Sequence, residues 1–120
     1  MNTINLYIGY EGYSEIILKE KLNNSNQIIF EVHLLEFHFN EVLSFIPLGQ
    51  YHPESIMYNY FRKNGWYDAE WECKRKQEFL DQLNAINNSI PSNLQSVYDA
   101  IKQICQSAIA HENHLYIELD

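Results

Sequence analysis

The helical pattern between residues 97 and 109 constrains the fold more than any other feature of the chain. Ser92 and Gln95, just before it, match a capping box, which indicates where a helix begins. The apolar residues that follow at helical spacing are Val97, Ile101, Ile104, Cys105, Ala108 and Ile109. A helix with one apolar stripe must bury that stripe against another layer of structure. The rest of the chain therefore has to supply a sheet or further helices that cover it.

Both ends of the chain are predicted to be strands. Apolar residues alternate with polar or small ones over residues 4–10 and again over residues 115–119. The tripeptide Leu-Tyr-Ile occurs in both segments, at 6–8 and at 115–117. We expect the two strands to occupy neighbouring places in one sheet.

Residues 14–22 are predicted to be helical, and residues 28–39 are predicted to be extended. Ser14 can cap a helix that carries Ile16, Ile17, Leu18 and Leu22, so residues 14–22 are predicted to be helical. Residues 28–39 are rich in strand-forming side chains, and the alternation changes phase between Leu34 and Leu35. A bend there would turn two triplets toward the core. These triplets are Phe30, Val32 and Leu34, and Leu35, Phe37 and Phe39.

Three more helices are predicted in the middle of the chain. Asn40 can cap a short helix over residues 41–46, which Pro47 ends. Pro53 can begin a second helix, whose apolar face comprises Ile56, Met57, Tyr60 and Phe61. Asp68 can cap a third helix that runs to about Ile86. Residues 1–120 are therefore expected to form one α/β (α+β) domain, with a small sheet that includes the N- and C-terminal strands and packs against several helices.

The charge balance restricts the partners of this chain. It has 16 Asp and Glu against 8 Lys and Arg, a formal net charge of −8. Such a surface repels nucleic acid and anionic membranes and attracts basic partners. The first residues lack the basic and apolar regions of a signal peptide, and no apolar run reaches the length of a membrane span. We therefore expect a cytoplasmic protein with no direct contact to nucleic acid or membrane.

The reactive residues show no recognisable catalytic or metal-binding motif. His111 and His114 have a spacing that could suit a metal, but no third ligand follows at zinc spacing. His33 and His38 could in principle form an acid–base pair, as in RNA cleavage, although no Lys or Arg lies near them in sequence. The two cysteines, Cys73 and Cys105, lack a CxxC spacing. We expect no catalytic residue, no metal and no cofactor.

The stretch from residue 64 to residue 72 is the most unusual part of the sequence. It contains three large aromatic residues and three acidic residues in the order Asn-Gly-Trp-Tyr-Asp-Ala-Glu-Trp-Glu. A purely structural reading makes Trp66 a contact at a helix end, Trp71 a core residue and Asp68 a cap. The functional reading is a patch of aromatic anchors among carboxylates that docks a basic cleft. The predicted protein-binding residues are Trp66, Tyr67, Asp68, Glu70 and Glu72, extended by Tyr51 and Glu54.

By its size, acidity, aromatic richness and lack of catalytic motifs, the whole chain resembles the small cytosolic immunity proteins that bacteria make against polymorphic toxins, including those of contact-dependent growth inhibition. This resemblance assigns no role to individual residues. It implies a heterodimer with one cognate toxin domain, often a basic nuclease such as an RNase or tRNase. Two alternatives remain open at this point: an adaptor or self-associating structural subunit, and a small enzyme that uses His33 or His38 as its base.

Overall fold

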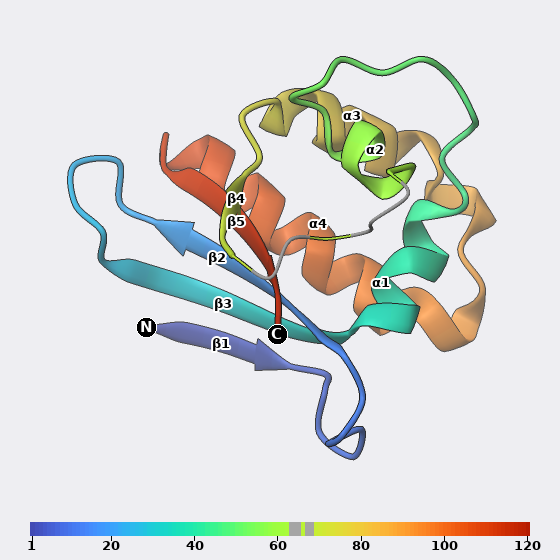
Figure 1. Cartoon of the computed structure of the whole chain (residues 1–120), viewed down its shortest axis with the longest axis horizontal. Coiled ribbons are helices and arrows are strands. Elements are labelled where there is room, and N and C mark those ends of the chain that lie inside the picture. Colours follow the sequence, from blue (N-terminus) through green and yellow to red (C-terminus); the bar gives the residue numbers. More distant parts are fainter. Residues whose placement is uncertain (63–65, 67–68) are drawn as a thin grey trace.

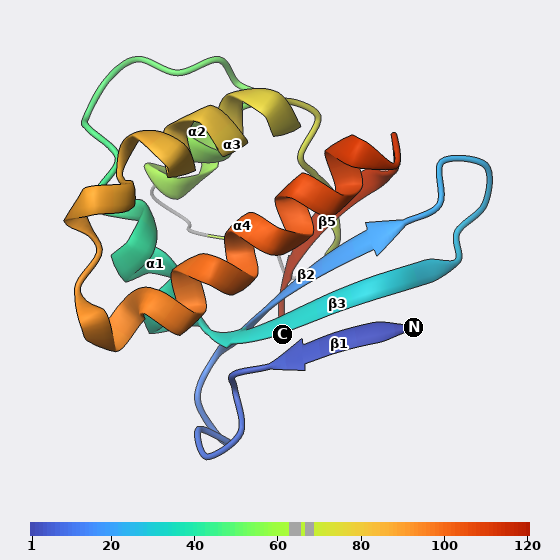
Figure 2. The same ribbon diagram turned by 180° about the vertical axis from the view of Figure 1, so that it is seen from behind.

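The computed structural model describes residues 1–62, 66 and 69–120, and it confirms the α+β class. A mixed sheet has the strand order β1-β3-β2-β5-β4, and the helices gather on one of its faces (Figures 1 and 2). The strands are β1 (Asn2–Asn5), β2 (Glu15–Lys21), β3 (Ile28–Leu35), β4 (Trp71–Glu72) and β5 (His114–Leu119). The helices are α1 (Glu36–Leu43), α2 (Ile56–Tyr60), α3 (Lys76–Ala85) and α4 (Gln95–Ala110).

The two terminal strands share one sheet, as predicted, but they are not neighbours. β1 lies at one edge and pairs in parallel with β3, whereas β5 pairs with β2 on one side and with β4 on the other. The sequence interpretation omitted β2, which separates β3 from β5. The strand predicted over residues 4–10 overlaps β1 at residues 4 and 5 alone, and the first Leu-Tyr-Ile follows β1 instead of lying in it. The repeated motif therefore does not mark adjacent strands.

The prediction of a helix over residues 14–22 is wrong, because Glu15–Lys21 forms the central strand β2. Its side chains follow a period of two. Ile16, Leu18 and Glu20 are buried beneath the helices, and the residues between them lie on the outer face of the sheet. An acidic residue at the third inward position hides this alternation in the sequence.

The predicted bend after Leu34 is the start of a helix. β3 ends at Leu35 and α1 begins at Glu36, five residues before the predicted helix start. Helical geometry separates the side chains that a strand would have aligned: Phe39 is fully buried, but Phe37 is 66% exposed. The expectation that Phe37 faces the core is therefore wrong.

The next two helices are shorter than predicted. Ser55 caps α2 and accepts a hydrogen bond from the Met57 amide, so Pro53 precedes the helix instead of beginning it. Phe61 follows the helix and is 40% exposed, so it does not belong to a buried face. The helix predicted from Asp68 to Ile86 is instead the strand β4 followed by α3, and the cap predicted at Asp68 lies outside the described residues.

The helix predicted from the pattern at 97–109 is confirmed as α4, which packs across β2 and β3. Of its predicted stripe, all members except the partly buried Ile109 are buried. A short 3₁₀ turn at Ser92–Leu94 precedes α4, and no side chain caps the helix, so the predicted capping box does not form. Tyr98 is buried as well, and its hydroxyl donates to the Leu83 carbonyl at 2.7 Å, which joins α4 to α3.

A buried carboxylate ties the end of α4 to the central strand. Glu20 is 0% exposed and accepts hydrogen bonds from Ser107 Oγ at 2.6 Å and from Asn113 Nδ2 at 2.7 Å. Asn113 is brought there by a left-handed turn at Glu112 (φ 56°), in which the Asn113 amide donates to the Ala108 carbonyl. A buried carboxylate needs such donors to offset the cost of leaving water.

We predict that Glu20→Ala lowers the free energy of unfolding by about 2–4 kcal/mol, because it leaves the Asn113 side-chain amide without its acceptor and the Ser107 hydroxyl with the longer contact to His111 Nδ1 at 3.3 Å. Ser107→Ala should cost only about 1 kcal/mol. Asp99→Ala, on the exposed face of α4, is the matched control. Urea titration measures all three, and equal losses for Glu20→Ala and Asp99→Ala would contradict this role for the carboxylate.

Candidate protein-binding site

Three of the seven predicted binding residues meet at one hollow beside β4. We call it the acidic hollow. It has a volume of about 290 Å³ and is lined by Pro53, Glu54, Glu70, Trp71, Glu72 and Lys74. Glu54 precedes α2, whereas Glu70 and Glu72 flank Trp71 in β4. The fold therefore brings together carboxylates from two separate segments, as the sequence analysis expected.

The outer face of the sheet holds two of these carboxylates in place. Glu70 receives hydrogen bonds from the ammonium groups of Lys21 at 2.6 Å and Lys19 at 3.0 Å, both on β2. The bond from Lys21 lowers the pKa of the Glu70 carboxyl most strongly, although burial opposes the shift. The Glu72 carboxylate lies 3.0 Å from His114 Nδ1. These contacts fix where the negative charge is presented.

The third carboxylate is freer than the other two. Glu54 lies 3.3 Å from Lys74 Nζ, and the side chains of the pair are 48% and 59% exposed. An exposed ion pair of this kind contributes at most about 1 kcal/mol and is screened by salt. Glu54 can therefore exchange Lys74 for a cation of a partner at little cost.

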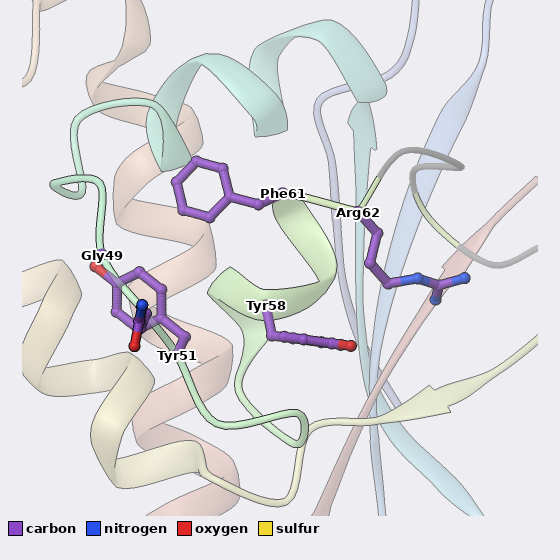
Figure 3. A pocket seen from close by; sticks show the side chains of 6 residues that line it. Gly49, Tyr51, Tyr58, Phe61 and Arg62 are labelled. Atoms are coloured by element: carbon purple, nitrogen blue, oxygen red, sulfur yellow. The ribbon is translucent and has the colours of Figure 1, made fainter.

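Tyr51, another predicted residue, lines a separate hollow, which we call the aromatic hollow. Figure 3 shows Tyr51, Tyr58 and Phe61 around this space, with Arg62 beyond the end of α2. The hollow has a volume of about 390 Å³, and Gly49 and Gln50 complete its lining. The rings of Tyr51 and Phe61 stack with their centroids 6.1 Å apart. Tyr58 is 44% exposed and Phe61 is 40% exposed, so both can contact a partner.

Trp66 is not the surface anchor that the functional reading expected. It is 6% exposed, its ring lies 5.1 Å from that of Phe39, and its Nε1 donates to Asn40 Oδ1 at 2.7 Å. The prediction of Trp66 as a binding residue is therefore not supported, and its structural role is to pack against α1. Tyr67 and Asp68 lie outside the described residues.

Several residues of the site escaped the sequence analysis. Tyr58 received no role, and Phe61 was assigned to a buried helix face. Lys19 and Lys21 fell within the segment predicted to be helical instead of on the sheet. The outward Ile17 and the inward Glu20 break the polar–apolar alternation over residues 15–21, so no local signal placed both lysines on the outer face.

The histidines of the enzymatic alternative are engaged in other contacts. His33 lies on β3 with Nδ1 2.8 Å from Glu15 and Nε2 3.2 Å from Glu31, so both ring nitrogens face carboxylates. A general base needs a free ring nitrogen that can reach the substrate. His38 lies on α1, and its ring contacts those of Tyr10 and Phe37. No hydrogen bond between the two histidines occurs in the described structure.

The remaining reactive residues give no catalytic arrangement within the described ranges. Cys73 and Cys105 are both buried, and burial raises the pKa of each thiol to about 12. Such thiols remain protonated and are poor nucleophiles near neutral pH. Among residues 1–62, 66 and 69–120, no group of three or more His, Cys, Asp and Glu side chains could hold a metal ion.

Comparison of the chain with protein-family models, curated proteins and solved structures finds no match. Within the described part of the chain, no helix has both the length and the apolar character needed to cross a membrane.

We predict that Trp66→Ala lowers the free energy of unfolding by about 3–5 kcal/mol, because it empties a packed site against Phe39. Trp66→Phe should cost less, because it keeps an aromatic ring in the site. Its remaining cost comes from the lost hydrogen bond to Asn40. Urea titration followed by circular dichroism gives both values. Unchanged stability of Trp66→Ala would show that the indole is not part of the core.

Proposed function

We propose that this protein is an immunity protein, which binds one cognate bacterial toxin domain in the cytoplasm and neutralises it by forming a stoichiometric complex. The proposed toxin is basic, with nuclease activity on RNA or tRNA as the first candidate. The observation that carries the proposal is the presence of two hollows, one aromatic and one acidic, whose linings come from residues 49–62 and 70–74. The resemblance to acidic immunity proteins agrees with it.

The two hollows would contribute to binding in different ways. Partly exposed aromatic side chains such as Tyr58 and Phe61 supply large contact areas with few rotatable bonds, and residues of this kind dominate binding energies. Carboxylates such as Glu54 and Glu72 attract a basic domain over longer distances and accelerate encounter. A toxin that binds anionic substrates presents the complementary positive surface.

The ion pairs indicate which carboxylates are most available to the toxin. Glu70 is held between two lysines of β2, so it is the least able to change partners. Glu54 has one exposed lysine as its partner, and Glu72 has a histidine. We therefore assign the main electrostatic contribution to Glu54 and Glu72.

The test of this role is neutralisation of a toxin in a growth assay. The candidate toxin is the C-terminal domain of a large secreted protein encoded immediately upstream of this chain's gene. Its expression should arrest growth, and co-expression of this chain should restore growth through a one-to-one complex. Absence of such a gene, or binding without rescue, contradicts the immunity role. A free protein that forms a stable homodimer and leaves the toxin unbound would favour the structural-subunit alternative.

Substitutions in the two hollows should have separable kinetic effects. We predict that Phe61→Ala raises the dissociation rate of the complex. The corresponding loss of binding free energy is about 2 kcal/mol if the ring is a hot spot. Glu54→Lys and Glu72→Lys should mainly lower the association rate, and the difference from wild type should shrink as salt is raised.

Asp81→Lys, on the exposed surface of α3, is the matched charge-reversal control. Surface plasmon resonance at several salt concentrations measures the rates, and urea titration checks the stability of each variant. If Asp81→Lys slows association as much as Glu54→Lys does, only the net charge matters and the acidic hollow is not the interface.

A further inference from the structure

A third hollow lies at one end of the sheet, where the β1–β2 loop meets the start of α1. We call it the loop hollow. It has a volume of about 350 Å³ and is lined by Tyr10, Tyr13, Leu35 and Phe37. Figures 1 and 2 show the loop projecting beyond the end of the sheet, in the part of the molecule where β5 ends. None of these residues belongs to the hollows described above.

Backbone contacts hold the loop hollow in shape. The Glu36 amide donates to the Ser14 carbonyl at 2.9 Å, which fastens the end of the loop to the start of α1. Within the loop, the Tyr7 hydroxyl donates to the Tyr13 carbonyl. Gly9 and Gly12 have φ values of 96° and 101°, which favour glycine and permit the tight path of the loop. A binding surface that is already shaped loses little entropy when a partner docks.

The apolar side chains around the loop hollow are unusually exposed. Tyr13 is 70% exposed and Phe37 is 66% exposed, which exceeds the exposure of either Tyr58 or Phe61. Ile8, in the same loop, is 71% exposed. The ring of His38 lies against Tyr10, with centroids 5.3 Å apart, and supports it from α1. Exposed apolar side chains gathered in this way mark interaction surfaces.

The charged residues closest in sequence to these side chains are acidic. Glu11 lies in the loop, Glu36 adjoins Phe37, and Asp120 is joined to Glu15 through both of their backbone amides. None of the eight Lys and Arg residues occurs within residues 1–18 or 22–61. The nearest lysine on β2, Lys19, is bonded to Glu118 and Glu70. The carboxylates of Glu11, Glu36 and Asp120 thus lack a basic residue of this chain close to them in sequence.

We infer that the loop hollow docks a basic segment of another protein, in which arginine side chains flank an apolar anchor. The apolar anchor occupies the space between Tyr13 and Phe37, and guanidinium groups pair with Glu11 and Glu36. A guanidinium also stacks on aromatic faces, which a lysine ammonium does less well. A second copy of this chain is a poor occupant, because two acidic rims would repel each other. That this basic segment belongs to the toxin rests on the proposed immunity function.

The experiment uses a short synthetic peptide in which arginine alternates with leucine, titrated into the full-length protein labelled with ¹⁵N. We expect saturable shifts of the amide signals of Tyr10, Tyr13 and Phe37, and weaker binding at high salt. Phe37→Ala and Glu11→Lys should each weaken binding by about tenfold, the effect of losing one important contact. Leu48→Ala and Asp99→Lys, at exposed sites elsewhere, are the matched controls and should bind as wild type does.

Three results would overturn the inference: no saturable shifts at the loop hollow, equal binding of a peptide with glutamate in place of arginine, or a homodimer in sedimentation that Phe37→Ala abolishes. The growth assay separates this failure from failure of the proposed function. If the peptide binds at the loop hollow but no toxin is neutralised, the immunity role fails and the docking site stands. If a toxin is neutralised equally well by wild type and by Phe37→Ala, and the peptide does not bind, the docking site fails alone.

Discussion

The packing of α4 against β2 and β3 is the contact on which the rest of the structure depends. β2 is the central strand, and its inward residues Ile16 and Leu18 are 0% exposed beneath the helical layer. The same strand carries Glu20, which fixes the far end of α4 through Ser107 and Asn113. The helices collect on this one face (Figures 1 and 2), and the outer face of the sheet carries Lys19 and Lys21 of β2.

This division of the sheet determines where negative charge is available. Lys19 and Lys21 project from the outer face of β2 and are used within the molecule, by Glu70 and Glu118. Their positive charge is therefore neutralised by carboxylates near β4. The loop hollow has no such compensation from neighbouring sequence, although it also combines aromatic rings with carboxylates. The sheet is thus ion-paired near β4, whereas the β1–β2 loop carries acidic residues with no Lys or Arg close to them in sequence.

The sequence predicted the parts of the fold whose patterns are local. The α4 stripe repeats over several turns, and residues 115–119 alternate, so α4 and β5 were identified. The N-terminal strand was placed too far along the chain, because β1 covers Asn2–Asn5. β2 was missed because Glu20 occupies an inward position, where it is bonded to Ser107 and Asn113, which are remote in the sequence. The site was predicted only in part, because contacts that are remote in the sequence also decide which of its residues are exposed. Glu54, Glu70 and Glu72 do meet, but the burial of Trp66 depends on Phe39 and Asn40 of α1, which no local pattern reveals.

Hydrogen–deuterium exchange of the protein, alone and in complex with a toxin domain that it neutralises, shows which surfaces the toxin covers. We predict slower exchange on binding in residues 49–61 and 70–72, where the aromatic and acidic hollows lie, and in residues 10–13 and 35–38 around the loop hollow. The exchange rates of the backbone amides in α3 should not change on binding. Protection confined to α3, with none at these hollows, would contradict the claim that aromatic and acidic surfaces of this chain capture a basic toxin.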